Sequence, residues 1–179
     1  MGGRGWQGLV PGLALSGVAG LLCGFSPPPQ QLPIEARWCL ENGRCLELEV
    51  ADESHEQSRG LQLRGPLPPL RGMWFPYSPP SLARFWMHHT PEPLDMLFVL
   101  GGRVVAIEAH TKPCLHLPCR SHGPDQQVDG VLELAAGQAA AQGIQVGSPV
   151  RIEALGGAER PLSSSRRQLD DQNGKHSSR

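Results

Sequence analysis

The 179-residue sequence lacks an excess of charge of either sign, and it lacks the short motifs that mark several enzyme classes. Lys and Arg number 16 against 17 Asp and Glu, so the formal net charge at pH 7 is −1. A near-neutral chain is not a general nucleic-acid binder, because such binding depends on neutralising phosphates. The serine-hydrolase motif G-x-S-x-G, the Walker phosphate loop and the zinc motif H-E-x-x-H are also absent. The sequence therefore offers no template for catalysis.

Long helical stretches are excluded as well, because glycine and proline are frequent. Gly contributes 22 residues and Pro 18, and both residue types disrupt helices. We therefore exclude a coiled coil, a helical solenoid and a bundle of long helices. Short apolar runs instead alternate with turn residues, which is typical of β proteins. The sequence predicts a mainly β fold: a compact β-sandwich or barrel-like single domain with two short helices.

The N-terminal region has the layout of an export signal. Within residues 1–25, Arg4 precedes an uncharged apolar run over residues 9–25, as in a secretory signal peptide or a short N-terminal membrane anchor. Lipidation at Cys23 is a further alternative, although Leu22 stands where a small residue is typical. We expect an exported protein, either periplasmic or anchored so that it faces outside the cytoplasm. If the segment is retained, residues 9–25 are a membrane tether.

Three further regions follow this segment. Residues 26–33 are a proline-rich linker, which we expect to be extended and poor at packing. Residues 34–155 carry the apolar runs and form the predicted β-domain, which is long enough for one hydrophobic core. Residues 156–179 are polar and are predicted to be a disordered tail. The chain thus has one folded domain, and we expect a monomer.

Turn residues locate the expected elements of the β-domain. Gly101-Gly102 separates two apolar runs and predicts a two-residue β-hairpin loop. Glu41-Asn42-Gly43 predicts a second hairpin. Asp52 is expected to cap a short helix that ends at Gly60. The expected strands are 37–40, 44–50, 85–88, 96–100, 103–107, 128–134 and 150–154, and a second helix covers 135–142.

Five cysteines are present, and four remain if residues 1–25 are removed. An even number behind an export signal predicts disulfides, here Cys39 with Cys45 and Cys114 with Cys119. A two-residue loop would point Cys39 and Cys45 to opposite faces, whereas a three-residue loop sets them opposite each other. A metal site at Cys114, His116 and Cys119 is the weaker alternative, since a fourth ligand is not evident. We therefore predict neither a metal site nor a cofactor.

Five sequence blocks occur in an order that carries a family resemblance. They are RGLQLR (59–64), RGMWF (71–75), FWMHHTPEPLDMLFV (85–99), GRVVAIEAHTKPC (102–114) and VLELAAGQAAAQGIQVGSPVRI (131–152). Over about residues 45–154 the chain resembles the bacterial and archaeal family called domain of unknown function 192. The resemblance implies a compact β-sandwich or barrel-like domain, often behind an export signal, and it implies no activity. His88-His89 stand where the family commonly has Lys-Asn.

Polar side chains in apolar surroundings are concentrated in the third of these blocks. We take five of its residues as candidate binding residues: Trp86, His88, His89, Thr90 and Asp95. Neighbouring residues of a strand point to opposite faces, so only one of the two histidines can join Asp95. The alternative for the histidines is an ordinary position at the surface.

The expected hairpin at Gly101-Gly102 sets Asp95 directly opposite Glu108, and like charges in such a position repel each other. Three explanations are open: the strands end before this pair, the two carboxyl groups share a proton with a raised pKa, or a cation bridges them. The first is the simplest. Glu133, in the run Val-Leu-Glu-Leu, is expected to point outward from its strand.

Glu108 and Arg64 are the remaining candidate binding residues, and Arg64 is either a bidentate partner of an anionic ligand or a structural arginine. We favour a non-catalytic exported β-domain that binds a small molecule, a polymer or an envelope protein, and no nucleic acid. The alternative is a metal-dependent or acid/base enzyme that uses Asp95, one of the two histidines and Arg64. The enzyme requires these side chains to converge in one cavity, whereas the binding module does not.

Overall fold

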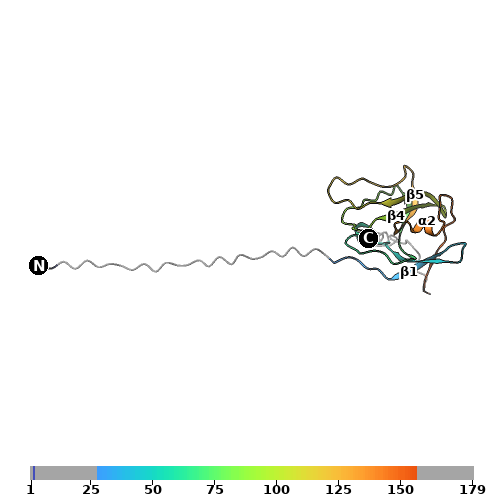
Figure 1. Ribbon diagram of the computed structural model, residues 1–179, viewed down its shortest axis with the longest axis horizontal. Coiled ribbons are helices and arrows are strands. Elements are labelled where there is room, and N and C mark those ends of the chain that lie inside the picture. Colours follow the sequence, from blue (N-terminus) through green and yellow to red (C-terminus); the bar gives the residue numbers. More distant parts are fainter. Residues whose placement is uncertain (1, 3–27, 157–179) are drawn as a thin grey trace, which may run out of the picture.

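The computed structural model describes residues 2 and 28–156 of the chain. The expected signal or anchor segment and nearly all of the expected polar tail lie outside these residues. The described part is mainly β and forms a single domain with two short helices, as predicted (Figure 1). Its seven strands belong to one sheet, which is not closed into a barrel.

The sheet has the strand order β5-β4-β6-β3-β2-β1-β7. Strands β2 and β3 pair in parallel, and the other neighbours pair antiparallel. In Figure 1, β4, β5 and α2 lie in the upper part of the domain and β1 lies in the lower part. The elements are β1 Ile34–Cys39, β2 Cys45–Val50, α1 Ser54–Arg59, β3 Arg71–Ser81, β4 Leu94–Leu100, β5 Arg103–Thr111, β6 Val128–Ala135, α2 Gln138–Ala141 and β7 Ile152–Ala154.

The two faces of the sheet carry separate hydrophobic clusters, because alternate residues of a strand point to opposite sides. On the first face, Leu132 and Leu134 of β6 belong to one cluster with Ala139 of α2, and we call this the helix face. On the second face, Val131 belongs to a cluster with residues of the connecting loops such as Leu61, and we call this the loop face. The central strands are therefore covered on both sides.

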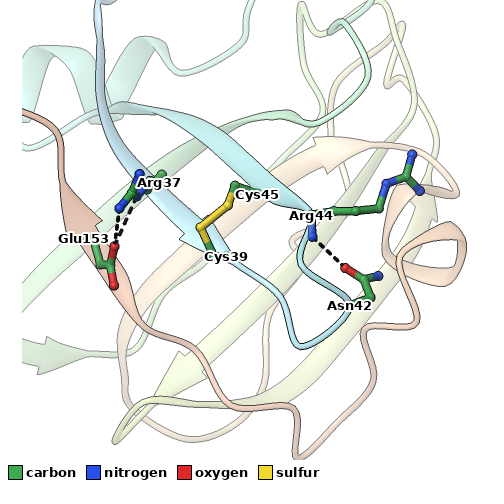
Figure 2. The surroundings of a disulfide bond; sticks show 6 residues. All are labelled: Arg37, Cys39, Asn42, Arg44, Cys45 and Glu153. Atoms are coloured by element: carbon green, nitrogen blue, oxygen red, sulfur yellow. Dashed lines mark hydrogen bonds and ion pairs between the residues drawn. A yellow bond between two sulfur atoms is a disulfide. The ribbon is translucent and has the colours of Figure 1, made fainter.

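The hairpin between β1 and β2 takes the three-residue loop. The Leu40 N–H donates to the Arg44 carbonyl over 2.8 Å, and Gly43 has a φ of 80°, a conformation that glycine adopts without strain. Cys39 then lies directly opposite Cys45, and the two form a disulfide (Figure 2). The prediction of this disulfide is confirmed, and the hairpin loop explains it.

A second disulfide joins Cys114 and Cys119, as predicted. The two sulfur atoms are thus not available to a metal. Within residues 28–156, no group of three or more His, Cys, Asp or Glu side chains is arranged to hold a metal ion. The helices of this described part are also too short or too polar to cross a membrane.

The central strand β3 is the largest element that sequence reasoning missed. It pairs with β6 on one side and β2 on the other, although it contains Pro76, Pro79 and Pro80. Proline cannot donate a ladder hydrogen bond, so a run with three prolines is unusual for a central strand. The ladder with β6 is irregular between Pro76 and Ser81, so the last two prolines lie where regular pairing is interrupted.

Three local predictions were wrong in detail. The N-cap of α1 is Glu53 rather than Asp52, and the Glu53 N–H donates to the Glu56 carboxylate over 3.1 Å. Helix α2 is shorter than expected because Ala135 extends β6 and pairs with Leu94. The expected strand at 85–88 is instead a loop that makes isolated bridges to the segment 114–122.

The second half of the proline-rich linker packs on the domain, contrary to the expectation for it. The Gln30 side chain donates to the carbonyl oxygens of Glu56 and Gly60, over 3.0 and 3.2 Å. The Leu32 side chain contacts the loop-face cluster, and its N–H donates to Glu49 over 2.9 Å. The domain therefore begins a few residues before β1.

Candidate functional site

Asp95 is buried on the helix face, with 1% of its surface exposed. One carboxylate oxygen accepts the His110 N–H over 2.9 Å, and the other accepts the Ala139 N–H over 3.0 Å. The first N–H lies near the end of β5, and the second lies in the first turn of α2, where helix N–H groups have no partner within the helix. Asp95 thus fastens β5 and α2 to β4, which is a structural role.

The expected opposition of Asp95 and Glu108 was wrong. The two-residue loop is present, since Leu100 pairs with Arg103, but a bulge follows: Val99 pairs with Val104 and Phe98 with Ala106. One extra residue in β5 shifts every later pair, so Glu108 lies opposite Met96. Neither a shared proton nor a bridging cation is needed at this pair.

Glu108 has partners of its own at the edge of the sheet. Its carboxylate lies 3.4 Å from the Arg120 guanidinium and 3.4 Å from Nδ1 of the nearly buried His122. The three residues tie β5 to the segment that follows the second disulfide.

Arg64 forms a bidentate ion pair with Glu49 of β2, at 2.7 and 2.9 Å. The two side chains are 12% and 9% exposed, so the pair is nearly buried. Glu49 occupies one N–H of each terminal nitrogen of the guanidinium and neutralises its charge. Arg64 keeps three further N–H groups as donors, since a guanidinium carries five.

A cavity of about 180 Å³ lies on the loop face, between the segment 61–67 and the segment 90–94. Eight of its eleven lining residues are apolar or glycine, and the other three are Arg64, Thr90 and Glu92. The apolar and glycine residues are Leu61, Gly65, Pro66, Leu67, Pro93, Leu94, Ala135 and Ala136. Two of the predicted residues, Arg64 and Thr90, line this same cavity.

The other five predicted residues lie elsewhere. Trp86 is 53% exposed, and its ring centroid lies 5.7 Å from that of His88. The His88 and His89 rings do not point to opposite faces but lie 3.8 Å apart, because the segment is a loop and His89 has a φ of 58°. Asp95 and Glu108 do not line the cavity. The side chains that the enzyme alternative requires are therefore spread over the helix face, the loop face and the surface.

Glu133 is a buried acid that sequence reasoning placed wrongly at the surface. It lies on the loop face of β6, paired with Met73 of β3 and Met96 of β4, and is 4% exposed. Burial raises the pKa of its carboxyl group from 4.5 to about 8. The pKa of Tyr77 is also raised, to about 12, by burial and then by the charge of Glu133.

A signal for this burial exists in the sequence. Alternation predicts an outward Glu133 only if one face of the strand meets solvent. In the run Val131–Ala135, however, all residues except Glu133 are apolar. A continuous apolar run is typical of a strand that is covered on both faces, and β6 is such a strand.

The comparisons with known proteins agree with this fold and add no activity. The family known as domain of unknown function 192, described as "Uncharacterized ACR", matches residues 38–152. The match spans more than half of the chain, so the chain belongs to this family. No curated protein matches the chain.

Two solved structures are similar to this domain. A protein of unknown function from Novosphingobium aromaticivorans DSM 12444 is 34% identical, with a TM-score of 0.58, and the match covers 65% of this chain and 83% of that chain. A protein from Sinorhizobium meliloti 1021, described as a candidate transcription regulator, is 29% identical, with a TM-score of 0.57. That match covers 67% of this chain and 92% of that chain. The expected family resemblance is confirmed.

Proposed function

We propose that this member of the family is an exported, non-catalytic binding module, and that the loop-face cavity takes a small, uncharged and largely apolar molecule. The cavity carries this proposal: it is concave, mostly apolar, and has a few polar groups that can orient a ligand, which is the usual composition of a small-molecule site.

The volume of the cavity limits the size of the ligand. An apolar cavity of about 150 Å³ holds one benzene molecule. The cavity here, at about 180 Å³, has room for a molecule of this size with one small substituent. A larger ligand, such as a polymer, could place only a single side group in the cavity.

The charges of the wall limit the chemistry of the ligand. The guanidinium of Arg64 is neutralised by Glu49, so it attracts an anion weakly but still offers N–H donors. Thr90 adds a hydroxyl, which can donate or accept, and Glu92 adds a negative charge at the half-buried position 92. A hydroxyl or carbonyl oxygen on the ligand would meet these donors without bringing a second negative charge beside Glu92.

Export is the second part of the proposal. Two disulfides in a domain of this size are typical of proteins that fold in an oxidising compartment. The sequence of residues 1–25, with Arg4 before an apolar run, supports the same compartment.

Binding is tested with three probes of similar size but different charge: benzyl alcohol, hexanoate and hexylamine. We expect benzyl alcohol to raise the thermal unfolding midpoint of the full chain, because a ligand that binds the folded state stabilises it. The two charged probes should give smaller shifts. Equal or larger shifts with hexanoate would contradict an uncharged ligand.

Two matched variants localise the binding. Ala136→Leu places three additional carbon atoms at the cavity wall, whereas Ala141→Leu makes the same change at an exposed position of α2. We expect the shift with benzyl alcohol to disappear in Ala136→Leu and to persist in Ala141→Leu. If all three proteins respond equally, or if none responds, the cavity is not the binding site.

A further inference from the structure

Three strongly exposed apolar side chains lie on two neighbouring segments of the domain. Trp86 is 53% exposed, Leu115 is 79% exposed and Leu117 is 62% exposed. The segments that carry them lie side by side, because Phe85 pairs with His122 and the segment continues to a bridge between His88 and Cys114. We call residues 84–90 and 112–121 together the tip.

The tip is held in place by its own bonds. The Cys114–Cys119 disulfide closes the loop that carries Leu115 and Leu117. The Cys114 N–H donates to the Met87 carbonyl over 3.1 Å, and the Phe85 and His122 backbones exchange two hydrogen bonds of 2.9 and 2.7 Å. A loop fixed at both ends cannot easily fold its leucines back onto the domain, so these side chains remain available to a partner.

The charge of the tip has one sign. Neither residues 84–91 nor residues 109–124 contain an Asp or a Glu. The acids that flank these segments are Glu92, Glu108 and Asp125. Glu108 and Asp125 are paired with Arg120 and Arg84 of the tip, and Glu92 lines the loop-face cavity. The tip also carries the exposed and positively charged Lys112 and three histidines, His88, His89 and His116.

We propose that the tip inserts into the surface of an anionic lipid membrane. Tryptophan prefers the boundary between water and lipid, and exposed leucines gain by burial among acyl chains. A surface without acids avoids repulsion by anionic headgroups, and Lys112 is attracted to them. An exposed, acid-free tip fits a lipid surface better than it fits a protein groove, which would have to enclose both leucines and the indole.

The test isolates the fluorescence of Trp86 in the full chain. The chain has four tryptophans, and of these Trp38 and Trp74 are 2% and 7% exposed. In a Trp6→Phe parent, brominated phosphatidylcholine mixed with phosphatidylglycerol should quench Trp86 alone, because lipid cannot reach the two buried rings. A Trp6→Phe, Trp86→Phe protein should show no quenching. This readout distinguishes tip insertion from simple attachment through residues 9–25.

The apolar contribution is tested with Leu115→Ser combined with Leu117→Ser in the same parent. Loss of two inserted leucines should weaken the quenching partition by about tenfold or more. Val146→Ser is the matched control, because Val146 is 61% exposed but lies outside the tip. It should leave the quenching unchanged. The near-UV circular dichroism of each variant verifies that the fold is intact.

Three results would overturn the proposal. The first is that the chain co-floats with the vesicles in a flotation assay while Trp86 stays unquenched, which would favour a protein partner for the tip. The second is quenching that the leucine variant does not reduce. The third is equal quenching on vesicles of phosphatidylcholine alone, because the tip would then have no preference for anionic lipid.

Discussion

Each face of the sheet contains a buried carboxyl group, and the two groups differ in their surroundings. Asp95, on the helix face, accepts two backbone N–H groups, one from the end of β5 and one from α2. Glu133, on the loop face, lies between two methionines, and burial alone raises the pKa of its carboxyl group to about 8. Asp95 therefore stabilises the fold by linking β5 and α2 to β4, whereas the burial of Glu133 costs free energy of folding.

The two faces also differ in how tightly they are packed at particular positions. An added Cβ at Gly130 on the helix face would clash with the Trp74 ring, while an added Cβ at Gly65, an exposed residue of the cavity wall, would meet nothing within 4 Å. The helix face is therefore tightly packed around Gly130, whereas the loop face has open space beside Gly65 and carries the buried acid Glu133. A binding site is more easily accommodated on the second.

The largest expected effect is the pH dependence of stability caused by Glu133. Its folded-state pKa lies above its unfolded value, so the folded protein holds a proton that the unfolded chain releases between about pH 4.5 and 8. Stability from this group is complete below pH 4.5 and decreases by about 1.4 kcal/mol per pH unit up to pH 8, or about 5 kcal/mol in all.

Urea unfolding at several pH values measures this effect. The free energy of unfolding of Glu133→Gln should rise relative to that of the natural protein as the pH increases from 5 to 8. Glu35→Gln, which changes an exposed carboxyl group of β1, is the control and should run parallel to the natural protein. Parallel curves for Glu133→Gln as well would show that the buried acid is already ionised.

The second effect tests the opposite face. Asp95→Ala removes the acceptor of two backbone N–H groups, and we expect a loss of about 3 kcal/mol, since hydrogen bonds to a charged group contribute about 1.5–3 kcal/mol each. Urea unfolding gives the loss. Amide hydrogen exchange should accelerate at His110 and Ala139 before other sites.

Asp95→Asn keeps one acceptor oxygen and should lie between the natural protein and Asp95→Ala. Asp52→Ala removes an exposed acid and should change stability by less than about 0.5 kcal/mol. A neutral result for Asp95→Ala would remove the distinction between the two faces, because neither acid would then support the fold.

The third effect compares one substitution on both faces. Gly130→Ala forces the Trp74 ring to move, and overpacking of this kind costs about 1–3 kcal/mol. Gly65→Ala meets open space and should leave the free energy of unfolding within about 0.5 kcal/mol of the natural value. Equal losses at the two positions, measured by urea unfolding, would contradict this difference in local packing between Gly130 and Gly65.

Local rules predicted the parts of this fold that depend on neighbouring residues. Gly43 and Gly101-Gly102 mark the two hairpins, and the three-residue loop at Gly43 is sufficient to pair Cys39 with Cys45. The same rules failed where contacts with segments distant in the sequence determine the structure. The strand β3 exists despite its prolines because β2 and β6 flank it, and one bulge in β5 moved Glu108 away from Asp95.

The candidate site was predictable in part for the same reason. Arg64 and Thr90 were identified as polar residues in apolar blocks, but their shared cavity depends on two loops that are 26 positions apart at these residues. Glu133 was misplaced because the coverage of both faces of β6 is a property of the whole sheet. Residue type thus indicated which side chains to consider, and tertiary packing decided what each of them does.

The smallest effect on stability should come from Thr90→Val, and it tests whether the loop face binds. Valine keeps the shape of threonine, so we expect a change of about 0.5 kcal/mol or less in a cavity wall. Thr111→Val is the matched control, because the Thr111 hydroxyl donates to the Leu94 carbonyl over 2.7 Å and its loss should cost about 1 kcal/mol. Titration calorimetry with benzyl alcohol should show weaker binding only in Thr90→Val, by about fivefold if one neutral hydrogen bond is lost. If Thr90→Val leaves the affinity for benzyl alcohol unchanged but greatly lowers the free energy of unfolding, Thr90 is a structural residue like Asp95.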